Sequence, residues 1–145
     1  MSNTTLSAYN LTLIADALLG IPYVRLGRNP QVGLDCWGLV IEFYKRMGVK
    51  LEDPVSGYTK DWWKEQDFVS AYANRQFEKI DEPETAAMLT LKTSGSKVDN
   101  HMAVMLSETE VLNSQEHVGI HRIKLYALKH LDHSFYRCRK LKIVP

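Results

Sequence analysis

Apolar residues recur at steps of three and four over two stretches in the first third of the chain. One covers residues 6–19 and the other covers 36–47, and each is followed by a glycine, Gly20 or Gly48. This spacing gathers apolar side chains on one face of a helix, and a glycine commonly follows a helix end. The sequence therefore predicts two amphipathic helices here, and a third over residues 59–75.

After residue 76, short apolar runs alternate with turn-forming residues. The predicted strands cover residues 77–80, 87–91, 102–106, 110–113, 118–123 and 135–143, with a short helix over 125–131. Helices followed by a meander of strands are typical of an α+β fold with an antiparallel sheet. We expect a single domain over residues 1–145, in which N-terminal helices, one of them carrying a cysteine, pack on this sheet.

Cys36 lies at the start of the second predicted helix, after a glycine-containing loop, and Asp35 before it is a suitable N-cap. A cysteine in the first turn of a helix feels the positive end of the helix dipole. That position favours the thiolate, which is the nucleophilic form. The alternative is that Cys36 is simply a small buried residue. We favour the nucleophile because a suitable base follows later in the chain.

That base is His101, at the start of the predicted strand over 102–106. Asn113 follows in the next predicted strand, and residues 107–109 between the strands are short and polar enough for a turn. Adjacent strands would bring the two side chains close together. An amide that holds a histidine in the correct tautomer is the arrangement that a cysteine nucleophile and its base require.

At these residues the chain resembles the NlpC/P60 family, the papain-like cysteine peptidases of bacterial cell walls. The family's first motif, a Gly-x-Tyr stretch, a glycine-rich loop and Asp-Cys-Ser-Gly-Leu, corresponds here to residues 20–39. Its second motif, a histidine before an apolar strand, corresponds to residues 101–106. The third catalytic position, often histidine in the family, falls on Asn113. The resemblance implies a papain-like fold with Cys36, His101 and Asn113 as catalytic residues.

Two residues depart from the family pattern. Trp37 stands where serine is usual, and Arg28 replaces the second glycine of a Gly-Gly pair. A tryptophan after the cysteine, and an ending such as residues 134–139, are similar to the branch found in tail-assembly proteins of tailed phages. The resemblance therefore implies phage tail proteins as partners. Trp37 itself either packs behind the cleft or narrows it, and we take it as a candidate substrate contact.

The resemblance also implies a peptidoglycan stem peptide as substrate, hydrolysed by a cysteine endopeptidase at the D-γ-glutamyl bond to diaminopimelate. The family places a tyrosine of the first motif at the active site, so Tyr23 is a candidate oxyanion donor beside the Cys36 N–H. The alternative for Tyr23 is a half-buried ring packed under the loop. Because diaminopimelate is zwitterionic, Arg25, Arg28 and Asp35 are candidate substrate-binding residues, and for Asp35 the N-cap role is a sufficient explanation.

Charge and composition narrow the function classes. The 145 residues carry 18 Lys and Arg against 17 Asp and Glu, with the two signs interspersed. We therefore expect no nucleic-acid surface. The histidines outside the proposed site lack acidic or cysteine partners at ligand spacing, so we expect no metal, and the proposed chemistry needs no cofactor. His117 is instead a candidate for the wall of the cleft.

No signal peptide is recognisable, and no apolar run is long enough to span a membrane. We expect synthesis in a host cytoplasm, which argues against a disulfide between Cys36 and Cys138, followed by assembly into a virion tail. Two alternatives stay open: a catalytically idle structural tail protein, and an interbacterial effector amidase of the same fold. Trp62 and Trp63, which either contact glycan or pack in an interface or core, do not separate these alternatives.

Overall fold

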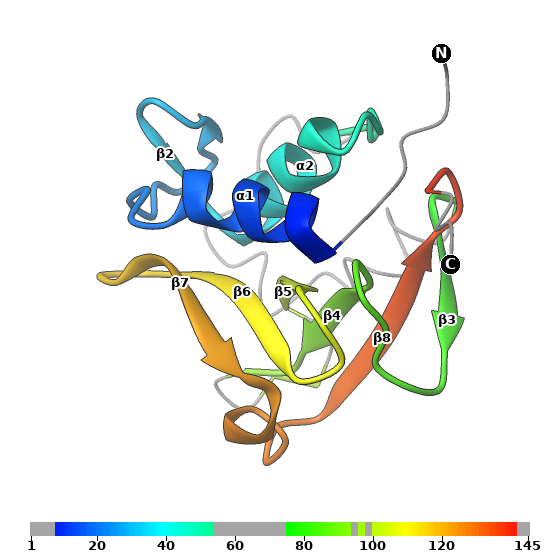
Figure 1. Cartoon of the computed structure of the whole chain (residues 1–145). Helices are drawn as coiled ribbons and strands as arrows, with labels where there is room; N and C mark the ends of the chain where they lie inside the picture. The colour runs from blue at the N-terminus through cyan, green and yellow to red at the C-terminus, as the bar shows by residue number, and fades with distance from the viewer. Residues whose placement is uncertain (1–7, 54–74, 94–95, 98–99, 142–145) are drawn as a thin grey trace.

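The computed structural model describes residues 8–53, 75–93, 96–97 and 100–141. Within this part of the chain, two helices cover one face of an antiparallel sheet (Figure 1). This arrangement confirms the predicted α+β fold. The predicted helix over residues 59–75, with Trp62 and Trp63, lies outside the described residues except at residue 75, which belongs to a turn.

The two helices have nearly the bounds that the sequence predicts, α1 over Ala8–Leu18 and α2 over Cys36–Arg46. In α1 the buried residues Leu11, Ala15 and Leu18 follow the helical spacing. In α2 the first five residues are all buried. The start of α2 is therefore buried, and the surroundings of that end determine what its residues can do.

In the described part of the chain, six strands form the main sheet in the order β3-β8-β4-β5-β6-β7, and every neighbouring pair is antiparallel. Their bounds are β3 Phe77–Ile80, β4 Met88–Leu91, β5 His101–Met105, β6 Glu110–Gln115, β7 Gly119–Lys124 and β8 His133–Cys138. All six predicted strands are present, but β8 ends at Cys138 before a turn, whereas the prediction continues that strand to residue 143, outside the described residues. The predicted helix over 125–131 is shorter, a 3-10 turn η2 over Leu125–Ala127. The last strand, β8, pairs with both β3 and β4, so the C-terminal part of the chain completes the sheet.

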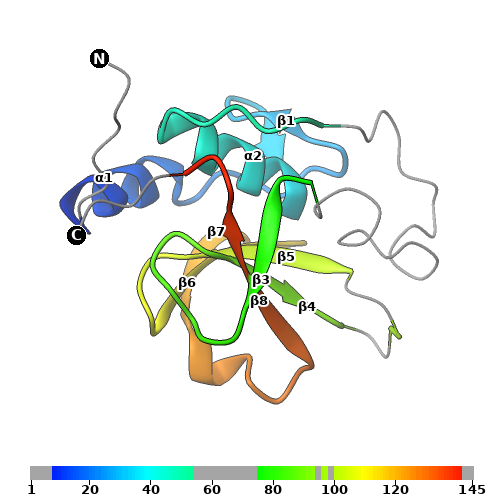
Figure 2. The same ribbon diagram turned by 90° about the vertical axis from the view of Figure 1, so that its right-hand side faces the viewer.

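Each face of the sheet carries its own apolar cluster. Met88, Met102 and Val104 point toward the helices and join the cluster that contains most of α2. Their neighbours in sequence, Leu89 and Ala103, belong to a second cluster on the opposite face. This alternation follows from the two-residue period of a strand. Figure 2 shows the helices stacked on one side of the sheet, with the second face turned away from them.

A short hairpin lies beside α2 where the sequence predicts only a loop. Its strands are β1 over Arg28–Asn29 and β2 over Gly33–Leu34. Gly27, just before β1, comes so close to α2 that a Cβ built on Gly38 would lie 2.1 Å from the Gly27 carbonyl oxygen. Glycine at position 38 therefore allows the hairpin backbone to pack directly against the first turn of α2.

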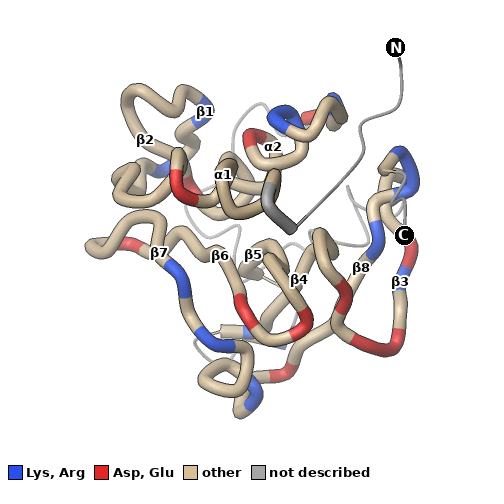
Figure 3. Tube along the Cα trace, viewed as in Figure 1, with Lys and Arg blue, Asp and Glu red and all other residues tan. Residues whose placement is uncertain are grey.

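Charged residues of both signs alternate over the face in Figure 3. Several form exposed ion pairs between elements, for example Arg137 of β8 with Glu84, and Arg122 of β7 with Asp16 of α1. Exposed pairs of this kind contribute little to stability, and the packing of the two apolar clusters carries most of it. No helix in the described ranges has the length and apolarity to cross a bilayer.

We expect Gly38→Ala to lower the free energy of unfolding by about 1–3 kcal/mol, because the new methyl group overlaps a backbone oxygen that cannot rotate away. Alanine gains about 1 kcal/mol of helix propensity over glycine, which offsets only part of this cost. Urea unfolding followed by circular dichroism measures the difference. Lys45→Ala, at an exposed position of the same helix, is the control and should change stability by less than about 0.5 kcal/mol. Equal stability of Gly38→Ala and wild type would contradict the close packing.

Candidate active site

Cys36 is the first residue of α2 and is buried, with an exposed fraction of 2%. Asp35 caps the helix as predicted: its Oδ1 accepts a hydrogen bond from the Gly38 N–H at 2.7 Å. The N–H groups of the first helical turn have no partner inside the helix. The backbone N–H of Cys36 belongs to this turn, and it therefore lies beside its own sulfur as a donor for developing negative charge.

Asp35 also holds the preceding loop in place. Its Oδ2 accepts a hydrogen bond from the Leu26 N–H at 3.0 Å, and its Oδ1 forms an ion pair with Arg28 at 2.9 Å. Arg28 donates from Nε to Asp53 at 2.7 Å, and the Trp37 indole N–H donates to the other oxygen of Asp53 at 3.1 Å. The two residues that depart from the expected motif, Arg28 and Trp37, thus share one carboxylate partner.

This network corrects the substrate-binding predictions for Trp37 and Asp35. The Trp37 side chain is 0% exposed and belongs to the apolar core cluster on the helix side of the sheet, so a substrate cannot contact it. Asp35 is 1% exposed and its oxygens already accept three hydrogen bonds. Arg28 pairs with two carboxylates, and neither Arg28 nor the exposed Arg25 belongs to the described residues that line the cavity at Cys36. The charges that the sequence assigns to substrate binding instead stabilise the loop, except at Arg25.

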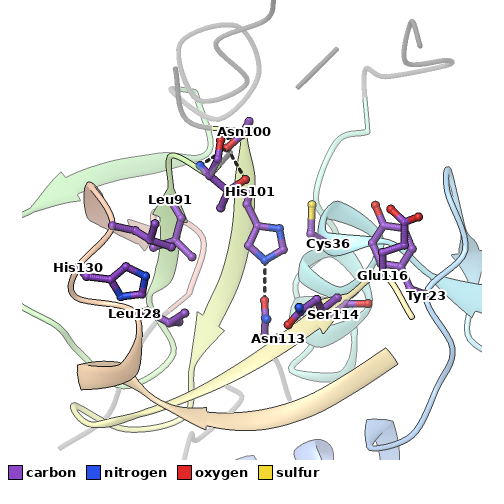
Figure 4. Close-up of a pocket in the computed structure, with 13 residues that line it drawn as sticks. Tyr23, Cys36, Leu91, Asn100, His101, Asn113, Ser114, Glu116, Leu128 and His130 are labelled. Atoms are coloured by element: carbon purple, nitrogen blue, oxygen red, sulfur yellow. Dashed lines mark hydrogen bonds between the residues drawn. The ribbon is translucent and has the colours of Figure 1, made fainter. Parts of the chain in front are cut away.

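His101 and Asn113 are joined by a hydrogen bond of 2.6 Å between the imidazole Nε2 and the amide Oδ1. An amide oxygen only accepts, so Nε2 carries the hydrogen and Nδ1 keeps its lone pair. In Figure 4 the imidazole lies between Asn113 and Cys36, with its other nitrogen on the side of the sulfur. His101 comes from β5, Asn113 from β6 and Cys36 from α2. The structure brings the three side chains together, with the imidazole between the amide and the sulfur as the sequence predicts.

Burial sets the protonation states of this pair. It raises the pKa of the Cys36 thiol to about 12, with a further increase from the Asp35 carboxylate. The N–H groups of Met102 and Trp37 oppose the shift but do not reverse it. Burial also lowers the pKa of His101, against the effect of its hydrogen bond to Asn113. Burial therefore opposes the thiolate that the sequence predicts: desolvation outweighs the donors at the helix N-terminus and favours a thiol beside a neutral imidazole.

Tyr23 lies on the other side of Cys36 from His101 (Figure 4). The ring is half-buried, and burial together with the nearby Cys36, Asp35 and Glu116 raises the pKa of its hydroxyl well above the usual range. The hydroxyl is therefore protonated at any ordinary pH and is available as a donor. The structure thus places Tyr23 at the sulfur, as predicted, and gives it the protonation state that an oxyanion donor needs.

The four residues face a single cavity of about 620 Å³. The sequence missed much of its lining, which includes Leu91, Thr93, Asn100, Ser114, Gln115, Glu116, Leu128, His130 and Leu131. Most of these occupy strand ends and turns, where no motif marks them. Asn100 is an exception, because it adjoins His101 in sequence; its side chain hydrogen-bonds to the backbone and hydroxyl of Thr93 and fixes the rim beside the histidine.

The remaining histidines and the second cysteine take no part in a metal cluster among the described residues. The prediction that His117 lines the cleft is wrong: its side chain is 88% exposed at the β6–β7 turn, outward from the cavity. His130, by contrast, does line the cavity. Both Cys36 and Cys138 are buried free thiols.

Comparison with known proteins gives a family and a fold. A sequence model of the NlpC/P60 family matches residues 20–139, a stretch that contains all the residues of the candidate site. In a search of curated proteins, none matched this chain.

Three solved structures are similar. An NlpC/P60 family protein from Bacillus cereus ATCC 10987 has a TM-score of 0.65 at 17% identity, covering 97% of this chain and 41% of that one. A protein described as similar to a lipoprotein of the NLP/P60 family, from Staphylococcus aureus subsp. aureus Mu50, has a TM-score of 0.60 at 20% identity, covering 100% and 45%. The NlpC/p60 domain of the peptidoglycan hydrolase SagA has a TM-score of 0.57 at 17% identity, covering 89% and 97%. This chain spans less than half the length of the first two, and the likeness shows the fold.

We expect alkylation of Cys36 by iodoacetamide to accelerate about tenfold per pH unit between pH 6 and 9.5 without levelling off. Only the thiolate reacts, and the pKa of the buried thiol is about 12. Peptide mapping by mass spectrometry separates Cys36 from Cys138. The urea-unfolded chain is the control, in which the rate should level off above the ordinary cysteine pKa of about 8.5. A plateau near neutral pH in the folded protein would indicate a resting thiolate and contradict this assignment.

Proposed function

Since the chain belongs to the NlpC/P60 family, we propose that it is a cysteine peptidase that hydrolyses the stem peptides of bacterial peptidoglycan. The observation that carries the proposal is the alignment of Cys36, His101 and Asn113 in one cavity, with a hydrogen bond of 2.6 Å between the last two. The similar fold of the SagA domain, which belongs to a peptidoglycan hydrolase, supports the substrate class.

Acylation begins from the neutral pair. As the Cys36 sulfur attacks the carbonyl carbon of the substrate amide, His101 Nδ1 takes the thiol proton. The C–N bond then breaks, and His101 gives the same proton to the leaving amine. Asn113 keeps the imidazole in the required tautomer and accepts a stronger hydrogen bond while the ring is positively charged. The products of this half are a thioester on Cys36 and a free amine.

The negative charge on the carbonyl oxygen requires donors that are already in place. The backbone N–H of Cys36 at the start of α2 is one, and the Tyr23 hydroxyl on the other side of the sulfur is the second. In the second half of the reaction, His101 takes a proton from water, which attacks the thioester carbon. The carbon–sulfur bond breaks, the proton returns to sulfur, and a carboxylic acid leaves.

Within this proposal, the D-γ-glutamyl bond of the stem peptide is the expected cleavage point, as the family resemblance implies. A place in a phage tail, with tail proteins as partners, rests on the sequence likeness at Trp37 and residues 134–139 and stays a prediction. The burial of Trp37 weakens the argument for an idle structural subunit, because the tryptophan is not among the described residues that line the cavity. The intact site favours an enzyme over that alternative.

We expect wild-type protein to release stem-peptide fragments from purified peptidoglycan, and Cys36→Ala to release none, because no other group supplies the nucleophile. His101→Ala should be slower by about 10²–10⁴-fold through loss of the acid and base. Liquid chromatography with mass spectrometry identifies the fragments and the bond. Cys138→Ala, which removes the other free thiol, is the control and should stay active. Fragments from Cys36→Ala equal to those from wild type would overturn the proposal.

Tyr23→Phe should lower kcat by about 10²–10³-fold with little change in KM, the usual effect of losing one oxyanion donor. The ring that packs under the loop is retained, so the melting temperature should stay near that of wild type. Steady-state kinetics on a soluble stem peptide measures the two constants. Tyr126→Phe, which removes a hydroxyl from a highly exposed ring, is the matched control. An unchanged kcat for Tyr23→Phe would remove Tyr23 from the reaction.

A further inference from the structure

The cavity has two ends of different chemistry, with His101 between them (Figure 4). Tyr23 and Glu116 lie at one end, beside Cys36, and contribute a hydroxyl and a carboxylate. Leu91, Leu128 and His130 lie at the other end, beyond the imidazole of His101, and Leu131 lines the same cavity. None of the described lining residues is a lysine or arginine. This leucine end therefore offers mainly apolar contact, with the His130 imidazole beside it, where the sequence predicts recognition of charge.

Leu91 is fixed to His101 by the pairing of strands. It is the last residue of β4 and lies directly opposite His101 in the register with β5, so both side chains project from the same face of the sheet. The exposed fraction of Leu91 is 1%, and its carbonyl oxygen accepts a hydrogen bond from the Asn100 N–H. The strand pairing therefore fixes the position of Leu91 relative to His101.

Leu128 and Leu131 come from the turn after η2. The Leu128 N–H donates to the Leu125 carbonyl oxygen and the Leu131 N–H to that of Leu128, so consecutive short turns hold the segment. Both side chains are half-buried and pack against the second apolar cluster, which leaves their remaining surface toward the cavity. Apolar surface presented in this way gains free energy when a ligand covers it.

The direction of the reaction decides which part of a substrate meets this end. His101 must give its proton to the leaving nitrogen, so the residue that carries this nitrogen lies along the imidazole. Its side chain then continues toward the leucines, while the acyl portion extends toward Tyr23 and Glu116. This step rests on the proposed function, because it takes Cys36 as the nucleophile and His101 as the acid.

We propose that Leu91, Leu128 and Leu131 form the subsite for the side chain directly after the scissile bond, and that this subsite recognises an aliphatic stem rather than the charges at its end. A long stem covers the leucines with its methylene groups, while a terminal ammonium or carboxylate extends to the open rim of the cavity. Substrate selection at this position therefore depends on the length of the aliphatic chain.

The test uses four soluble peptides with the same γ-D-glutamyl donor and a different following residue: alanine, norleucine, lysine or meso-diaminopimelate. Norleucine has an aliphatic stem and no terminal charge. We expect kcat/KM for norleucine to lie within about threefold of the lysine and diaminopimelate peptides. For alanine it should be at least about tenfold lower, since even one missing methylene in a hydrophobic pocket lowers kcat/KM by about tenfold or more. A drop of tenfold or more from diaminopimelate to norleucine would show recognition of charge and overturn the proposal.

Variants of the two half-buried leucines locate the effect without disturbing the buried Leu91. Leu128→Ala and Leu131→Ala should each reduce the norleucine-to-alanine ratio of kcat/KM toward one. Tyr126→Ala, in the same turn but 78% exposed and outside the lining, should leave the ratio unchanged. An unchanged ratio in both leucine variants would remove them from the subsite.

The proposed subsite and the proposed peptidase function are contradicted by different results. If the wild-type protein cleaves all four peptides at equal rates, the subsite is wrong and the peptidase stands. If it cleaves none of them while circular dichroism shows a folded chain, the proposed function falls and the subsite falls with it.

Discussion

The carboxylate of Asp35 is the contact on which the rest of the site depends. It is buried, yet it accepts hydrogen bonds from the first turn of α2, from the loop backbone at Leu26 and from the Arg28 guanidinium. Burial raises the pKa of this carboxyl group, and the donors around it oppose that change. A buried charge is tolerated only when it is paired and hydrogen-bonded, so the three donors and the helix end must stay where they are. The position of Cys36 follows directly.

That constraint explains why the site is kept although Arg28 and Trp37 differ from the family motif. Arg28 and Trp37 both reach Asp53, so the larger side chains form a second link between the loop, the helix and the segment after it. Gly38 allows the loop backbone to lie against the helix, where any side chain would collide. Tyr23, His101 and the turn after η2 line the cavity beside Cys36. The supporting residues Asp35, Arg28 and Trp37 are not among the described residues that line this cavity.

The sequence predicts the fold well because its signals are local. Alternating apolar positions mark the strands, and the three-and-four spacing from Cys36 to Met47 marks α2 and places Asp35 as its cap. His101 and Asn113 were within reach of the same reasoning, because a short turn between two strands brings them together. The protonation of Cys36 cannot be predicted in this way. The helix dipole can be inferred from the sequence, whereas the depth of burial depends on how β5 packs against α2. Leu91, Leu128 and Leu131 are brought to one cavity only by the long-range order of the strands. Their local sequence pattern does not show whether a leucine lines a cavity or packs in the core.

The neutral forms of Cys36 and His101, which burial favours, affect how the reaction begins. In the proposed reaction the thiol proton moves to His101 as the sulfur attacks, so the orientation of His101 by Asn113 matters for the rate. The proposed mechanism requires Cys36 to carry the acyl group of the substrate. Intact-protein mass spectrometry on the wild-type chain, quenched with acid shortly after mixing with a stem-peptide ester, detects such an intermediate. We expect a mass increase equal to the acyl group, mapped to Cys36 and absent in Cys36→Ala; cleavage of the ester without any adduct, equally fast in Cys36→Ala, would contradict the mechanism.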